Sequence, residues 1–439
     1  GIFFVHVARG SALPYTLVVT KGAAFDLEPN NAIAQGLTGR KAVLGFADSS
    51  GDRYSFNLAA GAKFSWGTSN PGASTNQLDA ALELYDPNGV LVASNDNGGG
   101  DGRSATLRFT VVTAGIYTLR VFGVNNTSGE YLLREQSSST NTRVVVAPDK
   151  GSQPIQVFAN GQVVLTIPTP FGAAYTGQGI RVAQGDVTGD GVPDIIAGNG
   201  PKATSQVRVF DGVTGAAVLD IIPFKKARAG VFVAAGDVNG DGRADIFVGG
   251  QSGNKVLVFN AVGGALLKTF VVKGYGGVHV AAGDVNGDGV ADLIAGKRTG
   301  SHVRIMDGAS TTGAILSEYD AFAKTHRRGV FVAAGDVDGD GKADVIVGAG
   351  AGKGSAGLVS VFKGTDSSLL YSNAIFGAGF IGGIRVAAGD VNGDGFADII
   401  VGAGSFAPKV SIVDGFTKEK KPDLLAFDSL TDPVGVFVG

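Results

Sequence analysis

One nine-residue acidic loop occurs five times in this chain. The second copy reads Asp237-Val-Asn-Gly-Asp-Gly-Arg-Ala-Asp245, and the others begin at Asp186, Asp284, Asp336 and Asp390. Oxygen-bearing side chains occupy positions 1, 3, 5 and 9, and glycines at positions 4 and 6 permit the sharp turns of a loop that wraps a small sphere. Because Ca²⁺ takes roughly six to eight hard oxygen ligands from flexible loops, the repeat predicts five calcium sites.

The expected ligands are the side chains at positions 1, 3, 5 and 9 and the backbone carbonyl at position 7, and the Asp at position 9 could bind through both oxygens. Position 3 of the first copy is Thr188, which predicts weaker binding there. The alternative interpretation is an Asx-rich hairpin turn without metal. The predicted ligand positions are Asp186, Thr188, Asp190, Val192, Asp194, Asp237, Asn239, Asp241, Arg243, Asp245, Asp284, Asn286, Asp288, Val290, Asp292, Asp336, Asp338, Asp340, Lys342, Asp344, Asp390, Asn392, Asp394, Phe396 and Asp398.

Composition and charge limit the class of protein. With 439 residues, two or more domains are expected, and 44% hydrophobic residues with 71 glycines indicate buried sheet and tight turns rather than disorder. The five loops hold 16 of the 39 acidic residues, so repulsion between carboxylates should loosen them without metal. No basic run with interleaved aromatic residues occurs, which argues against nucleic acid as a partner. No apolar run reaches the roughly 18 residues of a membrane helix.

The first twenty residues read as two strands with no domain in front of them. Residues 1–7 and 15–19 alternate and are rich in β-branched side chains, and a similar pair recurs at 115–121 and 131–133. Because an isolated hairpin is marginal in water, residues 1–24 are predicted to end a truncated upstream copy or to complete the sheet of a neighbouring chain. The start at Gly1 is expected for a processed or excised piece of something longer.

Residues 25–136 are predicted to form an antiparallel, jelly-roll-like β-sandwich, because short strand-like segments alternate with Gly- and Asn-rich turns. The segments LEPNN (27–31), GDRYSFNLAAG (51–61), LELYDPNGVLVASND (82–96) and AGIYTLRVFG (114–123) resemble the bacterial pre-peptidase C-terminal (PPC) domain, which is related to collagenase collagen-binding domains. The alternative for the acidic segment near residue 28 is a solvated turn. The resemblance implies one further calcium site at Asp26, Glu28, Asn30, Asn31 and Asp52.

After a polar linker at 137–142, residues 143–439 form a repeat array. The acidic loops are spaced 51, 47, 52 and 54 residues apart, a period typical of propellers and solenoids. Each unit supplies four strands: an a strand before the loop, a b strand after it, and then c and d strands. The loops, their spacing and their flanking strands resemble FG-GAP/VCBS repeats, known from integrin α-subunit heads and bacterial surface proteins. The resemblance implies a β-propeller.

The number of blades follows from the two ends of the array. Six segments match the c strand but only five loops are present; the array starts at a b strand (143–146), and residues 434–439 match an a strand. We therefore predict an all-β chain, a sandwich followed by a six-bladed β-propeller closed by the C-terminal strand, which removes open sheet edges. The alternative is a fragment of a seven- or eight-bladed propeller.

Basic and aromatic residues alternate when the a strands are aligned. If these side chains face the channel, three basic residues between three phenylalanines could hold an anion or a sugar acid. The alternative is that they pack between blades, with the arginines extending outward. The predicted ligand-binding residues are Arg181, His279 and Arg385, and the aromatic ones are Phe232, Phe331 and Phe437.

No recognised catalytic pattern occurs, so the chain is predicted not to be an enzyme. The histidines at 6, 279, 302 and 326 form no HExxH motif, and neither a GxSxG elbow nor a P-loop is present. There is no cysteine nucleophile, and the repeated carboxylates are better explained by calcium. The basic run at 326–328 is expected to be a solvated face.

The predicted function is that of a calcium-stabilised structural or adhesive protein of bacterial type, secreted or at the cell surface, where external calcium fills loops of modest affinity. The predicted partners are further copies of the chain, joined head to tail by strand addition into a filament or surface layer, or other extracellular proteins. The alternatives are a propeller that binds carbohydrate or matrix protein, and the non-catalytic accessory region of a secreted hydrolase.

Overall fold

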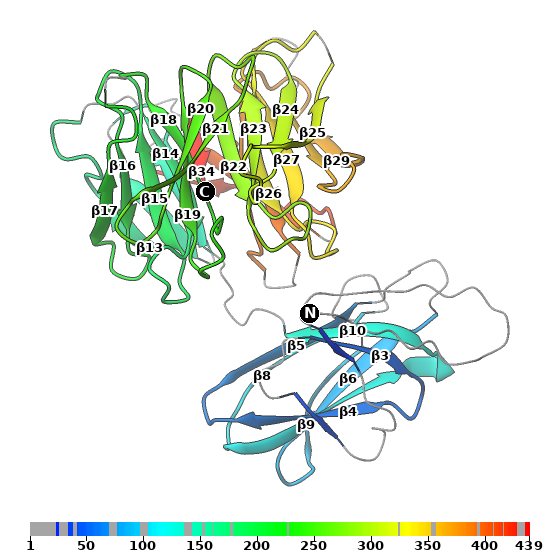
Figure 1. Ribbon diagram of the computed structural model, residues 1–439. Helices are drawn as coiled ribbons and strands as arrows, with labels where there is room; N and C mark the ends of the chain where they lie inside the picture. Colours follow the sequence, from blue (N-terminus) through cyan, green and yellow to red (C-terminus); the bar gives the residue numbers. More distant parts are fainter. Residues whose placement is uncertain are drawn as a thin grey trace. The chain divides into compact units, whose positions relative to one another are not determined.

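The computed structural model describes residues 23–25, 34–37, 42–69, 77–96, 104–135, 143–151, 154–159, 161–175, 179–225, 228–323, 325–352, 357–392, 396–406, 408–415, 417–427 and 435–439. The chain forms two compact units that divide between residues 138 and 139, and both are built from β-strands (Figure 1). Among the described residues, no helix is long and apolar enough to cross a membrane. The strands predicted within residues 1–20 and the predicted linker at 137–142 lie outside the described residues.

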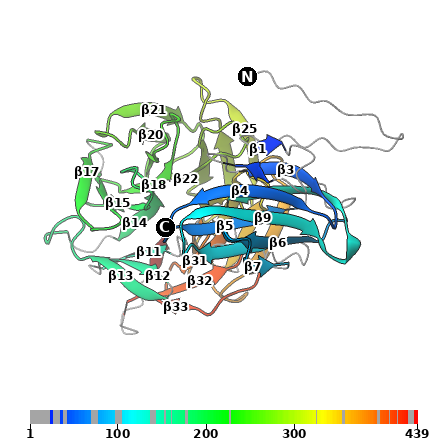
Figure 2. The ribbon, with the colours of Figure 1, turned by 90° about the horizontal axis from the view of Figure 1, so that it is seen from below.

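Within the part of the N-terminal unit that the structure describes, the strands form two five-stranded sheets. One has the order β1-β3-β10-β5-β8: Ala23–Phe25, Ala42–Ala47, Gly129–Glu135, Lys63–Ser69 and Thr106–Thr110. The other has the order β2-β4-β9-β6-β7: Gln35–Gly36, Asp52–Leu58, Gly115–Gly123, Ala80–Tyr85 and Leu91–Asn95, and Figure 2 shows β4, β9 and β6 lying in one layer. The predicted sandwich is antiparallel except at two edges, where β1 runs parallel to β3 and β2 parallel to β4. Its first described strand begins at Ala23, two residues before the predicted boundary.

Alternating side chains bury one face of each sheet of the sandwich. Along β9, Tyr117, Leu119 and Val121 are buried while their neighbours are not, the period expected of a half-buried strand. The single tryptophan, Trp66 on β5, is buried in the same core, with its ring centroid 4.8 Å from that of Phe56. The sequence analysis did not identify β3. The apolar pattern of β3 is interrupted by Gly45. A larger residue does not fit at this position, because its Cβ would lie 2.6 Å from the Tyr131 hydroxyl oxygen.

The described residues of the C-terminal unit form six four-stranded antiparallel sheets, which we call blades. In blade 1 the order is β34-β11-β12-β13, and in blades 2 to 6 four consecutive strands pair in chain order. Blade 1 consists of Val436–Val438, Arg143–Pro148, Ile155–Ala159 and Gln162–Ile167, in the order β34, β11, β12 and β13. Blade 2 consists of β14–β17, which are Ile180–Gly185, Asp194–Asn199, Val207–Phe210 and Ala217–Ile221. Blade 3 consists of β18–β21, which are Val231–Gly236, Asp245–Gly250, Lys255–Phe259 and Leu266–Val271. The strands of blades 4 to 6 are β22–β25, Val278–Gly283, Asp292–Lys297, His302–Met306 and Ile315–Asp320; β26–β29, Val330–Gly335, Asp344–Ala349, Leu358–Phe362 and Leu369–Ala374; and β30–β33, Ile384–Gly389, Asp398–Ala403, Lys409–Val413 and Leu424–Leu425.

Blade 1 combines strands from both ends of the array, as predicted. The C-terminal strand β34 pairs with β11, with Val438 opposite Val146. Gly439 and Val145 exchange two backbone hydrogen bonds, with N···O distances of 3.0 and 3.1 Å. Strand β34, red in Figure 1, also contacts β30 and β14, the innermost strands of the neighbouring blades 6 and 2.

Residues from the innermost strands β14, β18, β22, β26, β30 and β34 line the same cavity, which we call the channel. The second strands of blades 2 to 6 are buried on both faces; all six residues of β19, for example, are buried. Packing between adjacent blades explains why these segments read as apolar runs rather than as alternating strands. The inner strands of blades 2 to 6 each begin at one end of the channel and lead into an acidic loop at the other end.

Candidate functional site

The five acidic loops connect the first and second strands of blades 2 to 6, so they gather at the same end of the channel. Their backbone follows the predicted pattern. In the second loop, the carboxylate of Asp237 accepts hydrogen bonds from the N–H groups of Gly240 and Gly242, at 2.7 and 2.8 Å. Both glycines have left-handed φ values, 77° and 85°, which a side chain would disfavour. Residues 393–395 of the fifth loop, including Asp394, lie outside the described residues.

The Asp at position 9 of each loop connects the loop to the rest of its blade. Asp292 is fully buried; one carboxylate oxygen accepts the N–H of Val285 at 3.0 Å, and the other accepts the N–H of Gly308 at 2.8 Å. Burial raises the pKa of Asp292 to about 6, and the same cause raises that of Asp344 to about 6. Each oxygen therefore already has a backbone partner, a structural role that the sequence analysis did not predict.

The side chains at positions 1, 3 and 5 have the character of a cation site. In the fourth loop, carboxylate oxygens of Asp336, Asp338 and Asp340 lie within 4.8 Å of one another. The ammonium group of Lys363 lies 2.6 Å from Asp338 and 2.9 Å from Asp340, so a cation already bridges two of them. In the first loop, the Thr188 hydroxyl oxygen is buried and has no hydrogen-bond partner among the described residues. The clustered carboxylates of the fourth loop and the buried hydroxyl of the first loop are both hard oxygen donors, the ligands that Ca²⁺ prefers.

Neighbouring loops are joined to one another. The N–H at position 8 of each later loop donates to the backbone carbonyl at position 1 of the loop before it. The N···O distances are 2.8, 2.8, 2.8 and 2.7 Å for Ala244–Asp186, Ala291–Asp237, Ala343–Asp284 and Ala397–Asp336. The loops thus form a hydrogen-bonded series at one end of the propeller.

Only one of the ligands predicted for the sandwich site is among the described residues. Asp26, Glu28, Asn30 and Asn31 lie outside them. Asp52 is buried on β4, and its carboxylate accepts a hydrogen bond from the Tyr131 hydroxyl at 2.6 Å. Burial, followed by the nearby Tyr54 and Asp52, raises the pKa of Tyr131 well above its usual value.

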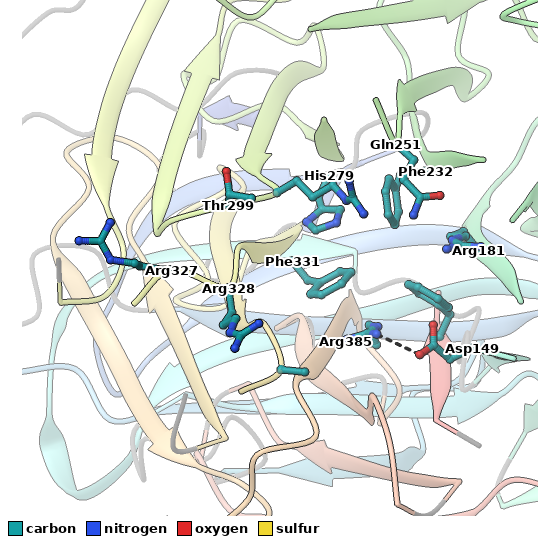
Figure 3. A pocket seen from close by; sticks show the side chains of 13 residues that line it. Asp149, Arg181, Phe232, Gln251, His279, Thr299, Arg327, Arg328, Phe331 and Arg385 are labelled. Carbon is teal, nitrogen blue, oxygen red and sulfur yellow. Dashed lines mark hydrogen bonds and ion pairs between the residues drawn. The ribbon is translucent and has the colours of Figure 1, made fainter. Parts of the chain in front are cut away.

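The alternating basic and aromatic residues meet at the end of the channel opposite the acidic loops. They line a pocket of about 480 Å³, which we call the channel pocket (Figure 3). These side chains therefore line the channel, which is the condition on which the predicted ligand site depends. The pocket is lined by Asp149, Arg181, Phe232, Gln251, His279, Arg298, Thr299, Arg327, Arg328, Phe331, Ala351, Arg385 and Phe437.

Each basic residue at the base of the channel pocket contacts two phenylalanines. The ring of His279 stacks on that of Phe331, at 4.1 Å between centroids, and meets Phe232 edge-on at 4.3 Å. The Arg181 guanidinium lies 5.3 and 5.1 Å from the ring centroids of Phe232 and Phe437. The Arg385 guanidinium lies 4.0 and 4.9 Å from those of Phe331 and Phe437. The phenylalanines therefore separate and orient the cations.

Burial divides the three basic residues into two cations and one neutral ring. It lowers the pKa of His279 to about 3, so this side chain is uncharged at neutral pH and does not act as the third cation. Its Nδ1 lies 2.5 Å from the carbonyl oxygen of Val330. Burial also lowers the pKa of Arg181 to about 10 and that of Arg385, but both guanidinium groups remain protonated at neutral pH.

Arg385 is only partly satisfied. Its Nη2 lies 3.1 Å from a carboxylate oxygen of Asp149, the ion pair drawn in Figure 3. Its Nε and Nη1 are buried without a hydrogen-bond partner among the described residues, although the residue is only 9% exposed. The absence of a side chain at Gly404 makes room for this group, since a Cβ there would lie 2.6 Å from Nη1. A buried guanidinium with free donors favours an anionic ligand.

Three exposed arginines form the rim of the channel pocket, and the sequence analysis assigned none of them to it. The expectation that 326–328 is a solvated face holds for Arg327 and Arg328, which are exposed and also line the pocket. It is wrong for His326, which is buried with Nε2 2.8 Å from the carbonyl oxygen of Gly329. Arg298 follows β23 directly, at the same repeat position as Gln251 after β19 and Asp149 after β11. Aligning the residues after the second strands would have revealed this position.

Comparison with known proteins matches both parts of the chain. Residues 222–295 and 336–401 match the model of the FG-GAP-like repeat, and residues 276–315 match the FG-GAP repeat. Residues 50–123 match the bacterial pre-peptidase C-terminal domain. The chain carries FG-GAP repeats preceded by a PPC domain. Both resemblances stated from the sequence are thereby confirmed.

Two rhamnogalacturonan lyases are among the solved structures that resemble this chain. The exotype rhamnogalacturonan lyase YesX has a TM-score of 0.37 and 15% identity, covering 80% of this chain and 63% of its own. The Bacillus licheniformis rhamnogalacturonan lyase PL11 has a TM-score of 0.36 and 14% identity, covering 90% of this chain and 72% of its own. The chain therefore spans less than two thirds of YesX, and likenesses at these TM-scores carry no information about its function.

Proposed function

We propose that this protein is a calcium-stabilised, non-catalytic scaffold of the bacterial exterior, whose repeat unit acts in adhesion. The observation that carries the proposal is the set of five acidic loops in one register, with the unsatisfied Thr188 hydroxyl and the carboxylate cluster of the fourth loop. The match to a bacterial PPC domain, a type found in secreted proteins, supports an extracellular location. External calcium is also concentrated enough to fill loops of modest affinity.

Calcium would neutralise the clustered carboxylates and stiffen the turns between strands. The side chains at positions 1, 3 and 5 and the carbonyl at position 7 would hold the ion, while the Asp at position 9 anchors the loop through backbone N–H groups. Because successive loops are joined by backbone hydrogen bonds, ordering one loop also restrains its neighbour. The expected result is a rigid end of the propeller.

The channel pocket supports a binding role more than a catalytic one. Its histidine, His279, is stacked on Phe331, and its lowered pKa leaves it neutral near pH 7. The carboxylate of Asp149 is paired with Arg385. A group that transfers protons at neutral pH needs a pKa near 7, and burial holds the pKa of His279 well below that. The proposed head-to-tail assembly falls on residues 1–20, which lie outside the described residues, and it stays a prediction.

Substitution at Thr188 tests the calcium proposal by gain of function. Thr188→Asp replaces a neutral hydroxyl with a charged carboxylate, the group that the fourth loop has at position 3 in Asp338, so the first loop should bind Ca²⁺ about tenfold more tightly. Isothermal titration calorimetry of the whole chain would measure this change. Thr188→Val, which keeps the shape but removes the oxygen, should weaken binding at the first loop.

The remaining loops serve as the internal reference in the same titration. Their affinities should not change by more than about twofold in either variant, apart from the adjacent second loop. No heat of Ca²⁺ binding by the original chain, or identical titrations for the Asp and Val variants, would contradict the proposal.

A further inference from the structure

We propose that the channel pocket binds the end of a glycan made of uronic acids. One carboxylate would lie between Arg181 and Arg385 at the base, and the carboxylates of following sugars would meet the rim arginines Arg298 and Arg328. This inference goes beyond the proposed scaffold role and does not require bound calcium, because the acidic loops lie at the other end of the channel.

The charge of the channel pocket selects an anion. Five arginines and one aspartate line it, a formal balance of +5 − 1 = +4 with His279 neutral. The whole chain is close to neutral, with a formal net charge of −3, so the positive charge is a local feature. Cations in a concave site with low-dielectric walls concentrate anions and raise their association rate.

The distribution of the arginines favours a ligand with several carboxylates. Arg181 and Arg385 are buried at the base, whereas Arg298, Arg327 and Arg328 are exposed at the rim, with Arg327 at the outer edge of the group in Figure 3. The planar guanidinium group binds a carboxylate through two parallel hydrogen bonds. The volume of about 480 Å³ is within the roughly 300–1,000 Å³ of small-molecule pockets.

The channel pocket also contains acceptors, which require a ligand with hydrogen-bond donors. The side-chain oxygen Oε1 of Gln251 is buried and has no partner among the described residues. Asp149 adds a carboxylate beside Arg385. Sugar hydroxyls can donate to such oxygens, whereas phosphate diesters, sulfate and simple carboxylates at neutral pH cannot. A carboxylate beside several hydroxyls is the defining chemistry of a uronic acid.

The aromatic rings are arranged in a way that disfavours stacking by a nucleobase. Phe331, on β26, lies between His279 of β22 on one side and Arg385 of β30 on the other. Both neighbours contact its ring, at 4.1 and 4.0 Å from its centroid. Since these neighbours already cover the ring, it orients the cations rather than offering a free platform for a planar base.

The test uses the whole chain and four small probes in titration calorimetry, with and without calcium. A trimer of galacturonic acid is an anion, and the formal charge of the pocket is +4, so we expect the trimer to bind with a measurable heat. Its methyl ester keeps the hydroxyls but loses the charge and should bind at least about tenfold more weakly. Sulfate and tri-glutamate keep the charge but lack sugar hydroxyls, and each should also bind at least about tenfold more weakly.

Variants connect this binding to the named residues. Arg298→Ala with Arg328→Ala removes two exposed charges and should weaken the trimer about tenfold or more, with an unchanged melting temperature. Gln251→Leu should weaken the trimer but leave sulfate binding unchanged. Lys255→Ala with Lys273→Ala is the matched control, because it removes two exposed charges outside the pocket and should leave binding unchanged.

Several outcomes would overturn the proposal. Equal binding of the trimer and its methyl ester would remove the role of the arginines. Sulfate or tri-glutamate binding as tightly as the trimer would make the pocket a general anion or peptide site. Full affinity in the Arg298/Arg328 variant would place binding elsewhere. If the trimer binds only when calcium is present, the loops rather than the pocket recognise it. The titration with calcium alone tests the proposed calcium sites independently of the glycan.

Discussion

At the residue scale, the same repeat position holds groups of different charge because the environment decides protonation. Arg181, His279 and Arg385 occupy equivalent positions on inner strands, and all three are buried. A guanidinium group remains protonated under this burial, whereas an imidazole loses its proton. The base of the channel pocket therefore carries two cations and one neutral aromatic ring, and His279 acts mainly as a packing residue.

His279 should make the protein less stable in acid. Burial lowers its pKa to about 3 in the folded state from 6.5, so below pH 6.5 the unfolded chain binds a proton that the folded chain excludes. Stability is thus lost as pH falls from 6.5 towards 3, by about 1.4 kcal/mol for each pH unit. Between pH 7 and pH 5, the free energy of unfolding measured with urea should fall by about 2 kcal/mol more in the original chain than in the His279→Phe variant. Equal losses in both proteins would contradict this.

At the element scale, strand β34 has a larger role than its three residues indicate. It supplies the innermost strand of blade 1 by pairing with β11, and Val436 and Val438 pack in a core cluster with Ile400, Ala387 and Val144. Without it, β11 would be an open edge with unpaired backbone groups at the centre of the unit. One short strand therefore joins the two ends of the array.

A charge on β34 should destabilise the repeat unit far more than a charge on the outermost strand of the same blade. Val436 is fully buried, so Val436→Lys should cost at least about 3 kcal/mol, because a lysine cannot be buried without a partner. Val163→Lys on β13 is the matched control; Val163 is 45% exposed, and the change should cost less than about 0.5 kcal/mol. Urea unfolding followed by circular dichroism would measure both, and similar midpoints would show that β34 is dispensable.

At the scale of the whole molecule, the chain contains two units with different chemistry. The sandwich has its own core around Trp66, while the repeat unit has acidic loops at one end of its channel and arginines at the other. The proposed calcium and glycan sites are thus far apart in the repeat, so each can be changed without altering the other. The two units should also respond differently to calcium.

Thermal unfolding should separate the two units. A chelator should lower the melting transition of the repeat unit by at least about 5 °C, because it removes ligands that bind only the folded loops. Trp66 is the single tryptophan and lies in the sandwich core, so its fluorescence follows that unit alone. We expect the calorimetric transition of the repeat to move more than the Trp66 transition. A larger shift in Trp66 fluorescence would indicate that the main calcium site is in the sandwich.

Local patterns in the sequence were sufficient to predict the strands of the repeat, the acidic loops and the order of the two units. Glycines at loop positions 4 and 6, oxygen side chains at 1, 3 and 5, and a period near 50 residues depend on contacts within one repeat, so they can be read from the chain itself. The pairing of the last strand with the first blade also followed, because the surplus strand at one end matches the missing strand at the other.

The tertiary structure decided the features that depend on residues from different repeats. It placed Arg298 and Arg328 on the channel pocket, paired Arg385 with Asp149 across 236 positions, and left Gln251 with an unsatisfied acceptor. It also removed the charge of His279 through burial. Distance in space, exclusion of water and the partners of a buried group arise only when the blades pack together, and a linear pattern contains none of them.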